Sequence, residues 1–169
     1  MSEKVKVYIG ASKGISFTSK LIRYYQFGYE YTHAFYVHDI QNLIITEAWH
    51  LPLLKGGKVY HKVPIYKNHS PGTYAVIYSI EVEDYQKVLI EKFLEEQAGK
   101  KYDFLGLLSF PFRNCSLNSK HRWFCSELVY ASFLYSNVEL LSSVKPCEVD
   151  VKTLLSSPLL VKESEFSIT

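Results

Sequence analysis

The residues best suited to covalent chemistry in this sequence surround Cys125, in the string from His121 to Leu128. Apolar residues recur at helical spacing from 124 to 135 and predict a helix over about 125–135. Cys125 then lies in the first turn, where the partial positive charge and free N–H groups of a helix N-terminus stabilise a thiolate or a developing oxyanion. Cys125 is therefore a candidate nucleophile. The alternative is a buried structural thiol, because cysteine is among the residue types most often buried in a core.

A histidine and a carboxylate occur on two neighbouring predicted strands. Composition predicts strands at 32–37 and 43–48, and the polar residues between them form a loop of hairpin length. If Val37 pairs with Leu43 across this loop, the two residue numbers of every directly opposed pair add up to 80. His33 then lies opposite Glu47, with Cβ atoms roughly 4.5–5.5 Å apart. A slip of one residue would place the two side chains on opposite faces. An imidazole held by a carboxylate is the acid–base group that a thiol nucleophile requires.

The rest of the chain predicts an α+β domain around these residues. Period-two alternation predicts strands, and apolar residues at spacings of three and four predict helices. Further strands are expected at 4–9, 57–63 and 73–82, and helices at about 16–27, 85–98, 102–108 and within 146–155. The length predicts a single domain over 1–169, with its core at about 5–155 and a mobile C-terminal tail at about 163–169.

Composition and charge exclude several classes of function. The 169 residues are 47% hydrophobic and 21% charged, which is the balance of an ordinary globular domain. A net charge of +2 with scattered lysines offers no basic surface for a nucleic acid. The sequence has no apolar run long enough to predict a transmembrane segment, and the N-terminal residues have no apolar run typical of a signal peptide. We therefore expect a cytoplasmic protein.

The other cysteines and histidines are expected to have structural roles. Three cysteines at irregular spacing predict thiols, so Cys115 and Cys147 are expected to be unpaired. No Cys-x-x-Cys occurs, and the histidine spacings match no familiar ligand pattern, so no metal or other cofactor is expected. The glycine-containing turn at 10–14 lacks the spacing of a phosphate loop. Surface or loop positions are expected for His38, His50, His61, His69 and His121.

Four short strings taken together resemble a known family. They are Thr32-His33-Ala34, Ile45-Thr46-Glu47-Ala48, Tyr102-Asp103-Phe104 and Trp123-Phe124-Cys125-Ser126-Glu127-Leu128. Their order is similar to that of the circularly permuted papain-like peptidases of the NlpC superfamily, and most similar to the YiiX-like group, in which the histidine strand precedes the cysteine helix. The resemblance covers about residues 5–155. It implies a permuted papain-like fold, in which an antiparallel sheet packs against helices and the nucleophile begins a late helix.

The resemblance also implies a role for each residue of the site. Cys125 would be the nucleophile, His33 the general acid and base, and Glu47 the residue that orients the imidazole. The backbone N–H of Cys125 would be one oxyanion donor, but no glutamine stands where papain-type enzymes use one for the second. Tyr102 and Ser126 are the candidates for that donor or for a substrate contact, and core packing is the alternative for Tyr102.

Three functional hypotheses remain open at this point. The leading one is a cysteine hydrolase that cleaves an amide, peptide or acyl ester bond through an acyl-enzyme, with a small-molecule or peptide substrate such as a cell-wall peptide or a lipid. The second is a catalytically silent module of the same fold that binds a ligand or peptide. The third is a lipid-directed thiol acyltransferase, although the apolar segment 157–161 is too short for an anchor. All three triad residues are present, which favours the hydrolase.

Overall fold

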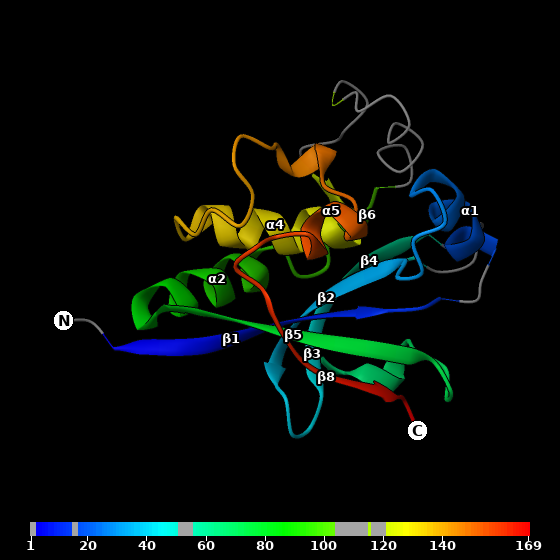
Figure 1. The fold of residues 1–169 in the computed structure, drawn as a ribbon, viewed down its shortest axis with the longest axis horizontal. Coiled ribbons are helices and arrows are strands. Elements are labelled where there is room, and N and C mark those ends of the chain that lie inside the picture. The colour runs from blue at the N-terminus through cyan, green and yellow to red at the C-terminus, as the bar shows by residue number, and fades with distance from the viewer. Residues whose placement is uncertain (1–2, 15–16, 51–55, 104–114, 116–120) are drawn as a thin grey trace.

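The computed structural model describes residues 3–14, 17–50, 56–103, 115 and 121–169. They form a mixed α+β fold in which helices lie against a curled sheet (Figure 1). None of the helices among these residues is long and apolar enough to cross a membrane. In chain order the elements are β1 (Lys4–Ser12), α1 (Phe17–Tyr25), β2 (His33–Asp39), β3 (Ile44–His50), β4 (Gly57–Pro64), η1 (Ile65–Lys67), β5 (Tyr74–Glu83), α2 (Asp84–Glu96), β6 (Lys101–Tyr102), β7 (Arg122–Trp123), α4 (Cys125–Tyr135), η4 (Pro146–Glu148), α5 (Val151–Leu155) and β8 (Val161–Ser167).

The eight strands make one sheet in the order β7-β6-β4-β3-β2-β1-β5-β8. Neighbouring strands are antiparallel except for the short parallel pair β6–β7. Strands β2 and β3, which carry the predicted histidine and carboxylate, lie in the middle of this order. Both side chains therefore lie on strands that are hydrogen-bonded to a neighbouring strand on each side.

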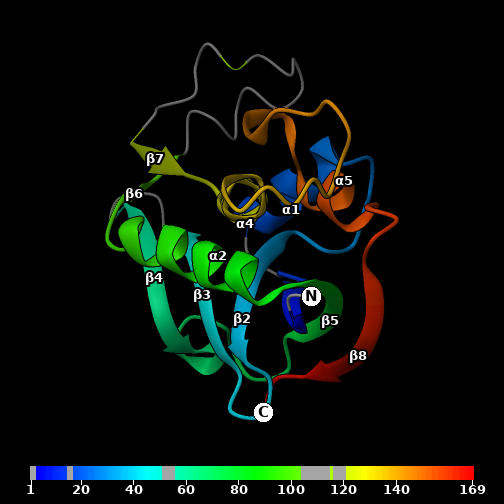
Figure 2. The same cartoon turned by 90° about the vertical axis from the view of Figure 1, so that its left-hand side faces the viewer.

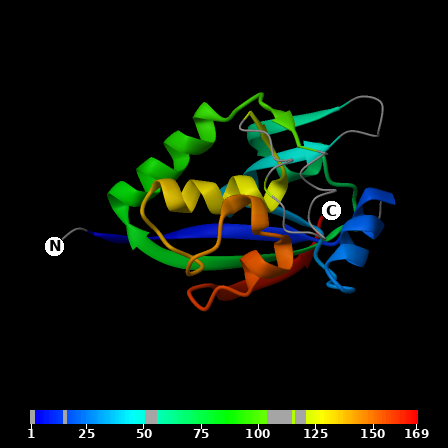
Figure 3. The same cartoon turned by 90° about the horizontal axis from the view of Figure 1, so that it is seen from above.

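Helix α4 lies across one face of the sheet, between α2 and α5 (Figures 2 and 3). Its residues from Cys125 to Phe133 are all buried, because the sheet covers one side of the helix and other helices cover the rest. Leu128 and Val129 pack in one apolar cluster with Tyr36 of β2. Helix α2 adds Ile90 and Leu94 to the same cluster. This packing fixes the position of the helix N-terminus, and with it Cys125.

A second apolar cluster fills the inside of the curl. It brings Phe35 and Val37 of β2 against Ile45 of β3 and Ile77 of β5. The Phe35 ring lies directly on Gly10 of β1, where an added Cβ would stand 2.0 Å from Phe35 Cε2. Only glycine fits there. Alternate residues of β2 thus face two different cores, as the pleat of a strand requires.

The register of the β2–β3 pair differs from the prediction by two residues. Tyr36 pairs with Thr46 and Val37 with Ile45, so paired numbers total 82 rather than 80. His33 is therefore level with Trp49, and Glu47 is its diagonal neighbour. A shift of two residues keeps every side chain on its predicted face, because the period of a strand is two. Diagonal neighbours remain within reach of long side chains.

The C-terminal tail is a strand and not a mobile segment. Strand β8 pairs with β5 along its length, and the backbone N–H of Ile168 donates to Thr73 O at 2.9 Å. The Ile168 side chain is buried in the inner cluster. The prediction of a mobile tail was wrong because the Lys-Glu-Ser-Glu run in β8 has no apolar alternation, so its pairing with β5 gave no signal in the sequence.

Cys115 and Cys147 form a disulfide, which corrects the prediction of two unpaired thiols. Their Cα atoms are 5.6 Å apart although 32 positions separate them in the sequence. Cysteine counting does not reveal such a contact, because only the fold brings η4 to Cys115. Disulfides persist mainly in oxidising compartments, so this bond weighs against the expected cytoplasmic location.

One predicted helix falls largely outside the described residues. The range 102–108 was expected to be helical, but Tyr102 belongs to strand β6 and 104–108 are not described. The predicted helix within 146–155 is split into η4 and α5. The other predicted strands and helices agree with observed ones to within a few residues at each end.

Candidate active site

Cys125 is the first residue of α4 and is buried, with 4% of its surface exposed. The backbone N–H groups of Ala34 and Ser126 donate hydrogen bonds to its sulfur. Burial by itself raises the pKa of the thiol, but the charge and hydrogen bond of His33, together with these N–H groups, lower the pKa below its ordinary value. The helix N-terminus acts in the same direction. The site therefore favours the thiolate.

His33 is the first residue of β2, and its imidazole contacts two partners, Glu47 and Cys125. Its Nε2 lies 2.6 Å from Glu47 Oε2. It also hydrogen-bonds to Cys125, and since Nε2 is occupied by Glu47, Nδ1 is the nitrogen that remains for the sulfur. Burial opposes the charged imidazole, but Cys125 and then Glu47 outweigh it and raise the pKa of His33 to about 10. Cys125 and His33 thus each favour the charged form of the other.

Glu47 of β3 is completely buried and accepts three hydrogen bonds. Oε2 receives His33 Nε2 at 2.6 Å and His69 Nε2 at 2.9 Å, and Oε1 receives Asn68 Nδ2 at 2.9 Å. Burial raises the pKa of this carboxyl, but the hydrogen bonds from His33 and His69 outweigh burial and lower the pKa to about 2. A buried carboxylate is tolerated only when it is paired in this way.

Asn68 and His69 are site residues that the sequence did not reveal. They follow η1, and the backbone N–H of His69 donates to Ile65 O at 3.2 Å. His69 lies in a loop, one of its two predicted positions, but it is not at the surface: it is 3% exposed and its ring centre is 5.4 Å from that of His33 and 4.7 Å from that of Trp49. Its polar surroundings in the sequence carry no periodic signal, so only the fold identifies it. We call Cys125, His33, Glu47 and His69 the thiol cluster.

Tyr102 and Ser126, the two candidates for the second oxyanion donor or a substrate contact, are placed differently. Tyr102 in β6 is buried, and burial followed by the charge of Cys125 raises the pKa of its phenol. The Ser126 hydroxyl instead donates to Val149 O at 2.7 Å. The hydroxyl proton is thus engaged by a backbone carbonyl, and the role of Ser126 as a substrate or oxyanion contact stays a prediction. The Ser126 backbone N–H contacts the Cys125 sulfur.

His33, Glu47 and His69 are residue types that bind metal ions, and their possible ligand atoms lie within 4.8 Å of one another. Ligands of a tetrahedral zinc ion are about 2.0–2.1 Å from the metal and hence roughly 3.3 Å apart. Both Nε2 atoms instead approach one carboxylate oxygen, at 2.6 and 2.9 Å. These separations are those of hydrogen bonds, so hydrogen bonds hold the three residues together here, and the set of two histidines and one glutamate is of a kind that zinc sites use.

Sequence comparison adds no family to this geometry. A scan against protein-family models finds no match, and a search of curated proteins finds no similar sequence. The likeness to permuted papain-like peptidases therefore remains a likeness of short strings. Any function has to be argued from the arrangement of the thiol cluster.

A second histidine cluster occupies the other face of the same strand pair. His38 Nε2 and His61 Nδ1 lie 2.7 and 3.1 Å from Thr46 Oγ1, and Glu91 Oε1 of α2 is 3.8 Å from His38 Nδ1. Burial, and then the charge of His38, lower the pKa of His61. His38 and His61 are half-buried strand residues and not surface or loop residues as predicted, whereas His121 is exposed as predicted. We call His38, Thr46 and His61 the hydroxyl cluster.

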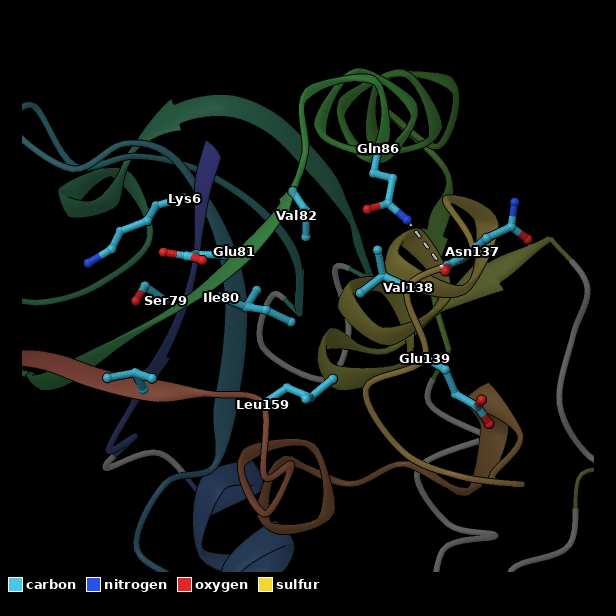
Figure 4. Close-up of a pocket in the computed structure, with 11 residues that line it drawn as sticks. Lys6, Ser79, Ile80, Glu81, Val82, Gln86, Asn137, Val138, Glu139 and Leu159 are labelled. Atoms are coloured by element: carbon cyan, nitrogen blue, oxygen red, sulfur yellow. Dashed lines mark hydrogen bonds between the residues drawn. The ribbon is translucent and has the colours of Figure 1, made fainter. Parts of the chain in front are cut away.

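Two cavities differ in their relation to the chemistry. One of about 210 Å³ adjoins the thiol cluster and is lined by His33, His69 and Tyr102, among others. His50, also predicted at the surface or in a loop, is half-buried and lines the same cavity. A larger hollow of about 610 Å³ lies between β5, the start of α2 and the end of α4 (Figure 4). Its described lining includes charged and aliphatic side chains but neither cysteine nor histidine, so the smaller cavity is the one that adjoins the thiol cluster.

Proposed function

We propose that this protein is a thiol hydrolase that cleaves an amide, peptide or acyl ester bond. Cys125 is the nucleophile, His33 the general acid and base, and Glu47 the residue that orients and charges the imidazole. One observation carries the proposal: a single buried imidazole contacts both the thiol that begins a helix and a fully buried carboxylate. That set matches the roles of a nucleophile–base–orienter triad.

The first half of the reaction forms a thioester. The Cys125 thiolate attacks the carbonyl carbon of the substrate, and the carbonyl electrons move to oxygen. When the tetrahedral intermediate collapses, the bond from carbon to the leaving nitrogen or oxygen breaks. The leaving atom takes the proton from His33 Nδ1, so an amine or alcohol departs and the imidazole becomes neutral.

The second half restores the enzyme. Neutral His33 removes a proton from water, and the resulting hydroxide equivalent attacks the thioester carbon. Collapse breaks the carbon–sulfur bond and releases a carboxylic acid with the Cys125 thiolate and the His33 imidazolium regenerated. Glu47 stabilises that imidazolium each time it forms, because its carboxylate stays ionised beside Nε2.

The oxyanion requires donors near the sulfur. The backbone N–H of Cys125 lies at the N-terminus of α4, where the helix dipole favours a developing negative charge. Tyr102, which lines the cavity together with His33, is the second candidate donor, since its raised pKa keeps it protonated. The chain order of a histidine strand (β2), a carboxylate strand (β3) and a late thiol helix (α4) also supports the permuted papain-like interpretation of the fold.

The proposal is tested by the pH dependence of alkylation of Cys125 with iodoacetamide, followed by intact mass in the wild type and in His33→Ala. An activated thiolate predicts rapid single-site labelling near pH 6 that slows in the variant. Labelling only above roughly pH 8 in both proteins is the behaviour of an ordinary thiol. That result would refute the hydrolase and leave a binding module of the same fold.

A further inference from the structure

The cavity beside the thiol cluster is reached from the imidazole and not from the sulfur. Its described lining includes His33 and Tyr102 but not Cys125. In an acyl transfer the acyl carbon bonds to sulfur, whereas the leaving atom must be close to the imidazole that protonates it. A group held in this cavity is therefore next to the proton donor. This geometry assigns the cavity to the leaving-group side of the scissile bond.

The cavity is small. Its volume of about 210 Å³ is below the roughly 300–1,000 Å³ of sites that enclose a drug-sized ligand. It is equivalent to about seven water molecules at roughly 30 Å³ each. One amino-acid residue or one monosaccharide fits this space, and a long alkyl chain does not.

The described lining of the cavity is uncharged apart from the thiol cluster. No Asp, Glu, Lys or Arg is among the described residues that line it. Two cations that neighbour lining residues in the sequence make contacts of their own: Lys13 pairs with Glu30 at 2.6 Å, and the Arg23 guanidinium donates to Gly14 O at 3.5 Å. A charged leaving group would lose its hydration here without gaining an opposite charge, which costs binding free energy.

The walls offer hydrogen bonds to a neutral polar ligand. Hydroxyl groups come from Ser12, Thr32 and Ser70, and the Trp49 ring supplies an apolar surface. His69 has its Nδ1 buried with no hydrogen-bond partner among the described residues. Because Nε2 donates to the Glu47 carboxylate, Nδ1 is left as an acceptor. A buried acceptor without a partner is costly, and a ligand hydroxyl or amide N–H would satisfy it.

We propose that this cavity binds the leaving group, and that this group is an uncharged amine or alcohol bearing a hydroxyl or amide, about the size of one amino-acid residue or one monosaccharide. The inference rests on the proposed thiol hydrolase. It adds a substrate class that the triad does not define, because the triad acts on the acyl carbon whatever the leaving group is.

The test uses the reverse of leaving-group departure. The enzyme is acylated with p-nitrophenyl acetate, and added α-amines compete with water for the acetyl-enzyme. Serinamide, leucinamide, lysinamide and the α-amide of glutamic acid share the reacting amine and differ in the side chain. Mass spectrometry counts each acetylated product, and the Cys125→Ala protein supplies the uncatalysed background.

We expect serinamide to capture the acetyl group about tenfold more efficiently than lysinamide or the glutamic acid α-amide, because an unpaired charge is penalised in the cavity. We also expect it to exceed leucinamide. Equal capture of all four amines, or a preference for lysinamide or leucinamide, would overturn the assignment. If iodoacetamide labelling is that of an ordinary thiol and no Cys125-dependent acetylation occurs, the hydrolase itself fails, and the subsite with it.

A charge placed in the cavity sharpens the test. Ser70 lies at the exposed rim of the lining, so Ser70→Asp is expected to raise lysinamide capture relative to serinamide by about fivefold. Ser142 is equally exposed but is not among the lining residues, and Ser142→Asp is the matched control, with an unchanged ratio. An unchanged ratio in Ser70→Asp, with a normal rate of acetylation, would place the acceptor elsewhere.

Discussion

The two faces of the β2–β3 strand pair carry two histidine clusters with different chemistry. On one face His33 and His69 both approach the Glu47 carboxylate, and Cys125 completes the thiol cluster. On the other face His38 and His61 approach the Thr46 hydroxyl. Both clusters place two imidazoles around one central oxygen. The central group differs: one is a buried anion and the other a neutral hydroxyl.

That difference decides the charge of each cluster. The carboxylate and the sulfur raise the pKa of His33 to about 10, whereas burial and a neighbouring imidazole lower the pKa of His61. A buried histidine is thus no indication of catalysis by itself. An anion on one side and an ionisable nucleophile on the other are what make an imidazole a proton carrier. Variants matched across the two faces test this distinction.

The largest effect is expected for Cys125→Ala. Removing the nucleophile should lower turnover of a cleavable substrate by roughly 10³-fold or more. The urea midpoint should change little, because the substitution removes one sulfur atom at the start of a helix. Steady-state kinetics and a urea titration of the same preparation provide both measurements. Full activity in this variant would show that Cys125 is not the nucleophile.

Matched substitutions of His33 and His38 compare the two clusters directly. We expect His33→Gln to lower kcat/KM by roughly 10²–10⁴-fold, because general acid–base catalysis is lost. His38→Gln should stay within about twofold of the wild type, since the contacts of its imidazole are the Thr46 hydroxyl and the Glu91 carboxylate at 3.8 Å, with no thiol among them. Both rates are measured on one substrate at pH 7. Equal losses in the two variants would mean that the clusters do not differ in function.

Replacing the buried Glu47 carboxylate by a neutral amide should make the thiol cluster resemble the hydroxyl cluster, whose central group is uncharged. Glu47→Gln keeps the shape but removes the charge that stabilises imidazolium, so we expect a loss of about 10²-fold in kcat. The pKa of His33 should fall toward its ordinary value, because Glu47 is one of the groups that raise it. NMR titration of the His33 ring measures this pKa. An unshifted titration would contradict the role assigned to Glu47.

Substitution of His69 tests whether this second imidazole holds the Glu47 carboxylate in position. His69→Phe removes the hydrogen bond to Glu47, and we expect kcat to fall by about tenfold, the equivalent of one hydrogen bond to a charged group. His69→Gln keeps a donor and should restore part of the loss. The alkylation rate of Cys125 across pH 5–9 follows the same order if the effect passes through Glu47. A purely structural role would leave that profile unmoved.

The smallest effect concerns stability and pH. The pKa of Glu47 is lowered in the folded protein from 4.5 to about 2, so its contribution to stability is complete above pH 4.5 and is lost as the pH falls through about 2. The urea midpoint of the wild type should therefore exceed that of Glu47→Gln at pH 6 and approach it near pH 3. A gap between the two proteins that widens at low pH would reverse the expected sign.

The predicted proximity of His33 and Glu47 survived an error in register because of strand geometry. The predicted pairing was two residues out, and an even shift preserves the face on which each side chain lies. An error of one residue would have separated the two side chains. The strand pattern therefore predicted the face, and only the fold decided that the contact is diagonal and that Trp49 stands level with His33.

The sequence by itself determined the local elements and the identity of three side chains in the site. Alternation and helical spacing are local properties, so they placed His33 at a strand start and Cys125 at a helix start. Only the tertiary structure decided the contacts that cross long stretches of chain: His69 on Glu47, β8 on β5, and Cys115 on Cys147. These contacts depend on how the sheet curls and where loops end, which no local pattern of residue types records. The charge of the site was decided there too, because burial and neighbouring groups set each pKa.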